Sequence, residues 1–511
     1  MQIKNFFDKM FSRIVLTILL ILAQILFLVT VIYAFASYYL PIATCLVALS
    51  IIITLFVIRL DESSSYKLTW VVIILAAPVF GGLLYLYLGN KRPMRQMRKK
   101  MDKEHSRLGV VLKQEEEVLE KMEPRLRDTS AYLAKYSGCP VRMNSGTEYF
   151  SCGEELYPVL LRELEKAERY IFAEFFIIAP GVFWDSVLEI LKRKAAEGVD
   201  VKLIYDDWGC MSNLPANFPK KLAEYGIKTL KFNPFIPVVS VIMNHRDHRK
   251  ILVIDGKTAF TGGFNLADEY INQKERFGYW KDSAVMIKGD GVLNLTALFA
   301  EMWNSFSEEK IDCGLCEAED YGDVKPCGFI QPFGDSPLDN EQVSENVYLE
   351  IINQARDYVY IFTPYLVIDD QMRVALSLAA KRGVDVRIVT PGIPDKKMVF
   401  RVTRSYYQTL ISAGVKIYEF TPGFIHAKSF VCDDRMAVVG SINMDFRSLY
   451  LHFECGVYMA SNEGGEIPAI MKLKQDCLDT FEKSHEVKRR ESRRFSHSLF
   501  DAVLRILGPL I

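Results

Sequence analysis

The sequence has almost no net charge, few histidines and no paired set of cysteines. Lys and Arg total 62 against 63 Asp and Glu, which gives a formal net charge of −1. Overall charge therefore does not indicate a nucleic-acid-binding protein. The ten cysteines are scattered through 511 residues. This is not a disulfide framework, and it favours a reducing compartment for the main body.

One close cysteine pair is present, Cys313 and Cys316 in "CGLC". A structural zinc site needs four ligands, and the sequence has no second pair at a suitable spacing. A metal or redox role for the pair stays open beside a second interpretation, two incidental linker thiols. We expect no cofactor and no metal.

Charged residues are also absent from residues 14–58. These 45 residues are enough for two membrane spans of roughly 20 residues each, and a third apolar stretch covers 68–89. A cleaved signal peptide is the alternative for the first segment, because "AFA" at 34–36 resembles a cleavage site. However, the apolar run before it is long for a signal peptide. The sequence predicts two or three spans and leaves their number open.

Seven Lys and Arg residues against one Asp occupy positions 91–103, directly after the last apolar stretch. Positive charge beside a span marks its cytoplasmic end, so we expect a multi-pass protein of the cell membrane with its catalytic body in the cytoplasm. Anionic lipid headgroups are a possible partner of this stretch. Three spans would leave Lys4, Lys9 and Arg13 outside, whereas two would keep both ends inside.

Beyond about residue 140 the sequence is one unit written twice. Residues 165–177, 192–206 and 222–232 are similar to 353–367, 377–391 and 410–420, and each follows the pattern helix, glycine, β-branched run. Alternating helices and strands predict an α/β fold, and the long period indicates a domain duplication. We expect these units: 1–90, the apolar region; 91–140, a basic juxtamembrane helix and linker; 141–308, the first repeat; 309–345, a linker; 346–482, the second repeat; and 483–511, a basic amphipathic tail.

Two stretches, one in each repeat, share a spaced set of polar residues. "HRKILVID" contains His248, Lys250 and Asp255, and "HAKSFVCD" contains His426, Lys428 and Asp433. Alternate residues of a strand share a face, so each His and Lys should point the same way. Each Asp comes after the strand, in a turn, and is not expected on that face. The turns "GGFN" (262–265) and "GSIN" (440–443) follow, and such turns can bring backbone N–H groups and an Asn amide to an anion.

These residues suit phosphoryl transfer without a metal. Two lysines and two asparagines around one point can neutralise the oxygens of a phosphodiester. One imidazole can attack phosphorus while the other protonates the leaving alkoxide. Residues 279–287 and 452–460 place Asp282 opposite Glu454 in the repeat. We expect Asp282 to orient His248 and Glu454 to orient His426; ordinary surface carboxylates are the alternative.

The two motifs look like the paired HxKxxxxD motifs of the phospholipase D superfamily. "NHRDHRKILVIDGKTAFTGGFNLADEY" (244–270), "TPYLVIDD" (363–370) and "LAAPVFGGLLYLYLG" (75–89) resemble bacterial cardiolipin synthases. The resemblance implies transmembrane helices followed by two α/β/α domains that share one active site at a pseudo-twofold interface. It implies catalytic residues, with His248 as nucleophile, and substrate-binding residues in the turns. The catalytic set is His248, Lys250, Asp255, His426, Lys428 and Asp433, and the substrate-binding set is Asn265, Asn443, Ser441 and Gly263.

The implied reaction moves a phosphatidyl group from one phosphatidylglycerol to a histidine and then to a second phosphatidylglycerol, giving cardiolipin and glycerol. Partners would be membrane phospholipids, with no nucleic acid, and the oligomeric state stays open. A phospholipase D that releases phosphatidic acid is the closest alternative, followed by a phosphatidylserine synthase. A nuclease and a non-catalytic lipid-binding scaffold are alternatives of other classes. Gly263 lacks the hydroxyl of Ser441, so the repeats are not equivalent.

The C-terminal tail combines "KRRESRR" (488–494) with six apolar residues on one helical face. This pattern favours an amphipathic helix at the membrane interface. A helix docked on the body is the alternative. The apolar residues are Phe495, Leu499, Phe500, Val503, Leu504 and Leu507.

Overall fold

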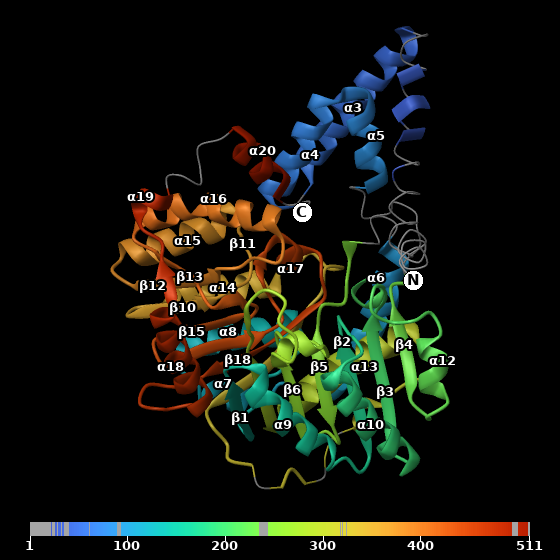
Figure 1. Ribbon diagram of the computed structural model, residues 1–511, viewed down its shortest axis with the longest axis vertical. Helices are drawn as coiled ribbons and strands as arrows, with labels where there is room; N and C mark the ends of the chain where they lie inside the picture. The colour runs from blue at the N-terminus through green and yellow to red at the C-terminus, as the bar shows by residue number, and fades with distance from the viewer. Residues whose placement is uncertain are drawn as a thin grey trace.

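The computed structural model describes residues 40–60, 62–88, 94–234, 244–316, 324–492 and 499–508, with isolated residues between 22 and 34 and between 318 and 322. Two β-sheets with flanking helices form the body, and a group of apolar helices extends from one end of it (Figure 1).

The apolar group consists of α3 (Leu40–Arg59), α4 (Ser64–Ala76) and α5 (Pro78–Leu88). Its buried side chains include Val57 and Trp70, and Tyr66 stacks on Phe446 of the second repeat at 6.1 Å. This contact joins the apolar helices to the body. Among the described residues, none of the helices is both long enough and apolar enough to cross a membrane. The first predicted span lies largely outside the described residues, and the predicted number of spans stays a prediction.

The basic stretch after the apolar helices forms a helix, as the sequence predicts. It is α6 (Arg95–Val111), and two shorter helices, α7 (Glu116–Glu120) and α8 (Pro124–Tyr136), lead from it to the first sheet. Helix α6 packs on α13 (Val292–Phe306), the last helix of the first repeat.

The first repeat is a seven-stranded sheet with strand order β1-β8-β6-β5-β2-β3-β4. Strands β2, β3 and β4 are parallel and the other pairs are antiparallel. Alternate residues of β2 point to opposite faces: Ile171 and Phe175 pack under α9 and α10, and Phe172 packs toward α13. The elements are β1 (Ser145–Phe150), α9 (Gly153–Leu164), β2 (Tyr170–Phe175), α10 (Val182–Ala196), β3 (Asp200–Asp206), α11 (Asp207–Cys210), α12 (Phe218–Ala223), β4 (Lys228–Phe232), β5 (Lys250–Ile254), β6 (Thr258–Gly262), η3 (Asp268–Ile271) and β8 (Ala284–Gly289).

The second repeat is an eight-stranded sheet with order β19-β13-β12-β10-β15-β16-β18-β9. Counted from β9, its first seven strands match β1-β8-β6-β5-β2-β3-β4 one by one, which confirms the predicted duplication. The elements are η4 (Cys313–Leu315), β9 (Phe329–Asp335), α14 (Val343–Gln354), β10 (Tyr358–Phe362), β11 (Leu366–Val367), α15 (Asp370–Lys381), β12 (Asp385–Pro391), α16 (Lys397–Ala413), β13 (Lys416–Phe420), β15 (Ser429–Cys432), β16 (Met436–Gly440), β17 (Met444–Asp445), α17 (Phe446–Tyr450), β18 (Glu454–Ala460), α18 (Pro468–Glu482) and β19 (Ser484–Glu486).

Strand β9 corrects the predicted domain boundaries. Its residues fall inside 309–345, which the sequence analysis assigns to a linker, yet they form the edge of the second sheet beside β18. Gly334 and Pro332 concealed the strand, because both residues are unusual in the interior of a sheet. An edge strand tolerates proline, since one side of it needs no hydrogen-bonding partner.

The two repeats are joined by short parallel pairings next to the predicted catalytic residues. Strand β7 (Tyr279–Lys281) of the first repeat pairs with β14 (Gly423–Ile425) of the second. A second parallel pairing joins Asp247 of the first repeat to Phe453 of the second. In each pairing, the segment before the carboxylate of one repeat lies beside the segment before the histidine of the other repeat.

Asp255 and Asp433 anchor backbone and do not face the imidazoles, which corrects their assignment to the catalytic set. Asp255 lies at the far end of β5 from His248, at φ 55°, and accepts hydrogen bonds of 2.8 Å from the backbone N–H groups of residues 168–170. Asp433, at φ 52°, does the same for residues 356–358 at 2.8–3.0 Å. Each carboxylate ties the turn after its strand to the start of the neighbouring antiparallel strand.

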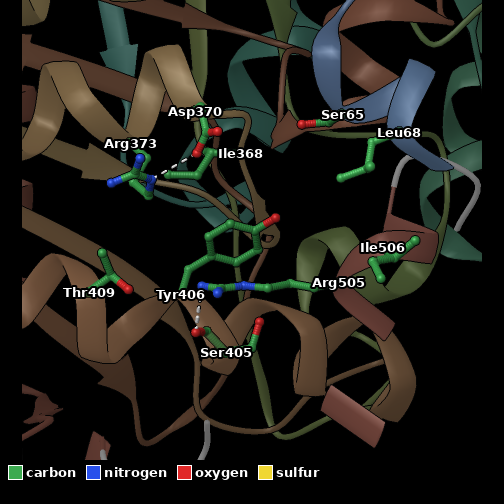
Figure 2. A pocket seen from close by; sticks show the side chains of 10 residues that line it. All are labelled: Ser65, Leu68, Ile368, Asp370, Arg373, Ser405, Tyr406, Thr409, Arg505 and Ile506. Carbon is green, nitrogen blue, oxygen red and sulfur yellow. Dashed lines mark hydrogen bonds and ion pairs between the residues drawn. The ribbon is translucent and has the colours of Figure 1, made fainter. Parts of the chain in front are cut away.

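The C-terminal helix α20 (Leu499–Leu507), which follows the short α19 (Arg489–Ser492), docks on α16 and α4. Leu504 is buried against Val367 and Val402, and Arg505 donates to the carbonyl of Ser405 at 2.9 Å. In this structure the tail is thus a helix docked on the body, the alternative that the sequence left open; Phe495 lies outside the described residues. A cavity of about 610 Å³ remains between α4, α16 and α20, with Arg505 beside the ring of Tyr406 (Figure 2).

We expect Asp255→Ala to destabilise the protein. The substitution removes the acceptor of three backbone N–H groups, and a hydrogen bond to a charged group contributes about 1.5–3 kcal/mol. The free energy of unfolding should fall by about 3 kcal/mol or more, as measured by thermal or denaturant unfolding in detergent, and Asp433→Ala should behave alike. Asp128→Ala, at an exposed position on α8, is the control. Equal stability of the Asp255 and Asp128 variants would contradict the anchoring role.

Candidate active site

The two predicted histidine–lysine pairs come together at the junction of the repeats. Lys250 is the first residue of β5 and His248 lies two residues before it, and His426 and Lys428 lie between β14 and β15. Lys250 and Lys428 are fully buried, and the side chains of both histidines are 10% exposed. Arg249, between His248 and Lys250, pairs instead with Glu174 at 2.6 Å. The alternation predicted for the strand is therefore confirmed on β5.

Each imidazole is held by a carboxylate of the other repeat. Nδ1 of His248 lies 2.9 Å from Oε1 of Glu454, and Nδ1 of His426 lies 2.7 Å from Oδ2 of Asp282. The predicted pairing of Asp282 with His248 and of Glu454 with His426 is wrong. The reason is the strand exchange between repeats, which places each carboxylate beside the histidine of the opposite repeat.

The ammonium group of each lysine contacts the backbone of the histidine two residues before it. Nζ of Lys250 donates to the carbonyl of His248, and Nζ of Lys428 donates to the carbonyl of His426. Burial lowers the pKa of Lys250 to about 8 and that of Lys428 to about 7, against the attraction of nearby carboxylates. Two ammonium groups in one buried site favour an anionic ligand, because an anion would restore their charged forms.

The same burial affects the imidazoles and their carboxylates. Burial and Lys428 lower the pKa of His426 to about 4, and burial and Lys250 hold the pKa of His248 well below its ordinary value. Burial opposes the ionisation of Asp282, yet His426 and Lys428 hold its pKa below the usual range. Burial raises the pKa of Glu454 well above the usual range, despite Lys250. The two dyads therefore differ in the direction of the carboxylate's pKa shift, which is downward for Asp282 and upward for Glu454.

The asparagines of the glycine turns support the site from both sides. Asn265 donates to Oη of Tyr270 at 2.7 Å and accepts from the N–H of Ile177 at 2.9 Å. Asn443 donates to Oγ of Ser448 at 2.9 Å, and its Oδ1 is buried with no hydrogen-bond partner within the described part of the chain. Asn265 is therefore committed to the protein on both sides of its amide, whereas Asn443 retains an unused acceptor.

Gly263 and Ser441 occupy equivalent positions in the two repeats but make different contacts with the carboxylates. A Cβ at Gly263 would lie 2.0 Å from Oδ1 of Asp282, so the carboxylate occupies the space of a side chain. Ser441 donates its hydroxyl to Oε2 of Glu454 and accepts from the N–H of Cys455 at 3.0 Å. The two repeats therefore differ here, as predicted, and the difference lies in the contacts that hold each carboxylate.

His452 is a site residue that the sequence analysis missed. Its ring lies 5.6 Å from that of His248, and its Nδ1 lies 3.9 Å from Oε1 of Glu454. It precedes Glu454 by two residues, so it shares that side of the strand, and this spacing could have revealed it. Donor atoms of His248, His452 and Glu454 lie within 4.8 Å of one another, which is a possible arrangement for a metal ion. The ammonium of Lys250 beside them opposes a cation there.

Comparison with known proteins agrees with this geometry. A family model described as "Cardiolipin synthase, PLD-like domain" matches residues 160–303 and 348–482, and one described as "Phospholipase D-nuclease N-terminal" matches residues 48–90. An uncharacterised protein of Streptococcus mutans is 42% identical over 462 residues, covering 89% of this chain and 99% of its own length. A cardiolipin synthase of Alkalihalophilus pseudofirmus is 32% identical over 477 residues, covering 91% and 94%.

A solved structure shows the same fold at low sequence identity. The phosphatidylserine synthase of Haemophilus influenzae superposes with a TM-score of 0.56 at 13% identity, covering 75% of this chain and all of that one. The duplicated sheets, the two family matches that span both repeats, and the similarity over most of the chain agree. The chain belongs to the family of cardiolipin synthases with phospholipase D-like domains.

Proposed function

We propose that the protein is a cardiolipin synthase that transfers a phosphatidyl group between two phosphatidylglycerol molecules. The observation that carries the proposal is the pair of buried imidazoles, each held at Nδ1 by a carboxylate of the opposite repeat and each backed by a lysine. With Nδ1 engaged, Nε2 of each ring is the atom available to a substrate. Relatives with 32% identity over most of the chain bear the name cardiolipin synthase.

In the first step, Nε2 of His248 attacks the phosphorus of one phosphatidylglycerol. A P–N bond forms, the P–O bond to the headgroup glycerol breaks, and His426 gives its proton to the leaving alkoxide. The pKa of His426 is about 4 in the empty site. A bound phosphodiester anion raises it, because negative charge beside an imidazole favours the protonated form. Substrate binding thus creates the acid that the step needs.

In the second step, a glycerol hydroxyl of another phosphatidylglycerol attacks the phosphohistidine. Its proton goes to His426, the P–N bond breaks, and cardiolipin leaves. Lys250 and Lys428 lie beside the phosphoryl oxygens and stabilise the charge of both transition states. Asp282 and Glu454 orient the rings. In this assignment Asp255 and Asp433 are structural.

We propose in addition that the apolar helices hold the enzyme at the membrane, with the basic helix α6 against anionic headgroups. Many large apolar side chains on α3, α4 and α5 are exposed, such as Ile52 at 62%, Leu55 at 63% and Leu75 at 58%. An exposed apolar surface of this extent marks an interaction with lipid or with protein. A substrate with acyl chains makes lipid the simpler assignment, and the two or three predicted spans and the cytoplasmic body belong to this proposal.

Product analysis tests the reaction. Membranes with the wild-type chain and labelled phosphatidylglycerol as the sole lipid should yield cardiolipin and free glycerol, and His248→Ala should yield neither. His485→Ala, which alters an exposed histidine outside the site, is the control and should retain activity. Phosphatidic acid without cardiolipin would show that water is the acceptor and would favour the phospholipase interpretation. Cardiolipin from His248→Ala would remove His248 from the reaction.

Binding of the substrate anion should weaken as the pH rises. The pKa of Lys428 is about 7 and that of Lys250 about 8, so both ammonium groups are lost on going from pH 6 to pH 9. The Kd of a non-hydrolysable phosphonate analogue of phosphatidylglycerol should rise from pH 7 to pH 9 as the two ammonium groups lose their protons. In Lys428→Arg the rise should begin nearer pH 8, because arginine stays charged. A flat profile in the wild type would contradict a charged role for the lysines.

Gly263→Ala should damage the site more than Ser441→Ala. The new methyl group would displace the carboxylate of Asp282 from His426, and a misplacement of about 1 Å can cost about 100-fold in rate. Ser441→Ala removes one hydrogen bond to Glu454 and adds no atom, so its loss should be smaller. Initial rates of cardiolipin formation measure both effects. Similar rates in the two variants would show that the space at Gly263 is not needed.

A further inference from the structure

Three aromatic rings surround His426. The rings of Trp280, Tyr270 and Phe424 lie 5.3, 5.4 and 5.8 Å from the imidazole, and all three residues are at least 94% buried. The pairing of β7 with β14 places Trp280 opposite Phe424, with ring centroids 4.8 Å apart. The aromatic wall, defined as these three residues, is thus built by both repeats at the point where they exchange strands.

The equivalent positions around His248 are not aromatic. Gly262 pairs with Ala284 in the first sheet and Gly440 pairs with Gly456 in the second, so position 280 corresponds to position 452, which is His452. The position two before each histidine is Phe424 in one repeat and Arg246 in the other. The side-chain amide of the turn asparagine donates to Tyr270 in the first repeat and to Ser448 in the second. The fold therefore does not require an aromatic wall; one side of the site alone has it.

The wall surrounds the histidine that handles the attacking hydroxyl. Under the proposed function, the first glycerol leaves the His426 side, and a new hydroxyl must then enter there before the phosphohistidine breaks down. A trapped water molecule needs two to four polar partners, and aromatic faces supply few. A glycerol headgroup places its C–H groups on the rings and needs a partner for the reacting hydroxyl only. The wall thus disfavours water relative to a lipid alcohol.

Trp280 adds a directional contact to this wall. Its indole N–H is buried and has no hydrogen-bond partner among the residues that the structure describes. A buried donor without a partner costs free energy, which a ligand oxygen would recover. Under the proposed function, an oxygen of the incoming headgroup, from either its hydroxyl or its own phosphate, is the candidate partner of this N–H.

We infer that the aromatic wall of Tyr270, Trp280 and Phe424 selects a lipid alcohol over water as the acceptor of the phosphatidyl group, with Trp280 as the specificity-determining residue. This inference rests on the proposed function. It concerns which acceptor, water or a lipid alcohol, takes the phosphatidyl group from the covalent intermediate, and not how that intermediate forms.

The test places a residue of one repeat at the equivalent position of the other. Trp280→His introduces the side chain found on the His248 side, and the ratio of phosphatidic acid to cardiolipin from labelled phosphatidylglycerol should rise about tenfold or more, an effect within the range of pocket discrimination. Trp280→Phe keeps the wall but lacks the N–H, so it should give a smaller rise. Tyr279→His, at a 39% exposed residue next to Trp280 in the same strand, is the matched control and should leave the ratio unchanged.

A second measurement keeps the result interpretable. Rapid denaturation in detergent at mildly alkaline pH, where the P–N bond is stable, should trap labelled lipid on the protein in wild type and in Trp280→His, which shows that the variant folds and completes the first step. An unchanged product ratio in a Trp280→His variant that forms the trapped adduct would overturn the inference, and so would an equal rise in Tyr279→His. Failure of the proposed function would be distinct, because the wild type itself would then form no cardiolipin.

Discussion

The exchange of short strands between the two repeats is the constraint on which the site depends. The pairing of β7 with β14, and of Asp247 with Phe453, fixes each carboxylate within 3 Å of the other repeat's imidazole. Neither repeat alone contains an oriented histidine, although each carries a full motif. The reacting groups must be held within a fraction of an ångström for efficient catalysis. The interface between the repeats is therefore part of the catalytic apparatus, and the duplication makes both dyads from one chain.

Burial gives the site its chemistry and also its electrostatic cost. Two lysines, two histidines and two carboxylates share a space from which water is largely removed, and unpaired charge in such a space is expensive. Burial therefore lowers the pKa values of the two lysines and of the two imidazoles. A phosphodiester anion reverses these shifts when it binds. The substrate thus supplies the charge that the protein lacks, which couples recognition of the phosphate to activation of the acid and of the lysines.

Much of this arrangement could be predicted from the sequence, because it depends on local spacing. The duplication, the histidine–lysine pairs on shared strand faces and the identity of Asp282 and Glu454 all follow from patterns within one repeat. The pairing of these carboxylates could not be predicted, since it depends on which segments of different repeats meet. The edge strand β9 was concealed by Pro332 and Gly334, whose usual positions are turns. His452 could have been found from its position two residues before Glu454, whereas Trp280 gave no signal, because a lone tryptophan in such a pattern most often packs in a core.

A duplicated scaffold makes two similar sites, but an ordered reaction needs them to differ. The differences lie at the residues that contact the dyads: Gly263 makes room for the shorter Asp282, whereas Ser441 donates to the longer Glu454. The pKa of Asp282 is held below its usual range, whereas that of Glu454 is raised above it. One imidazole faces three aromatic rings, and the other faces Phe176 and His452. Because the backbone of the two sheets is matched strand by strand, side chains alone create this polarity. A few substitutions on a symmetric frame are therefore enough to give the two histidines different surroundings, which the proposed division of roles between them requires.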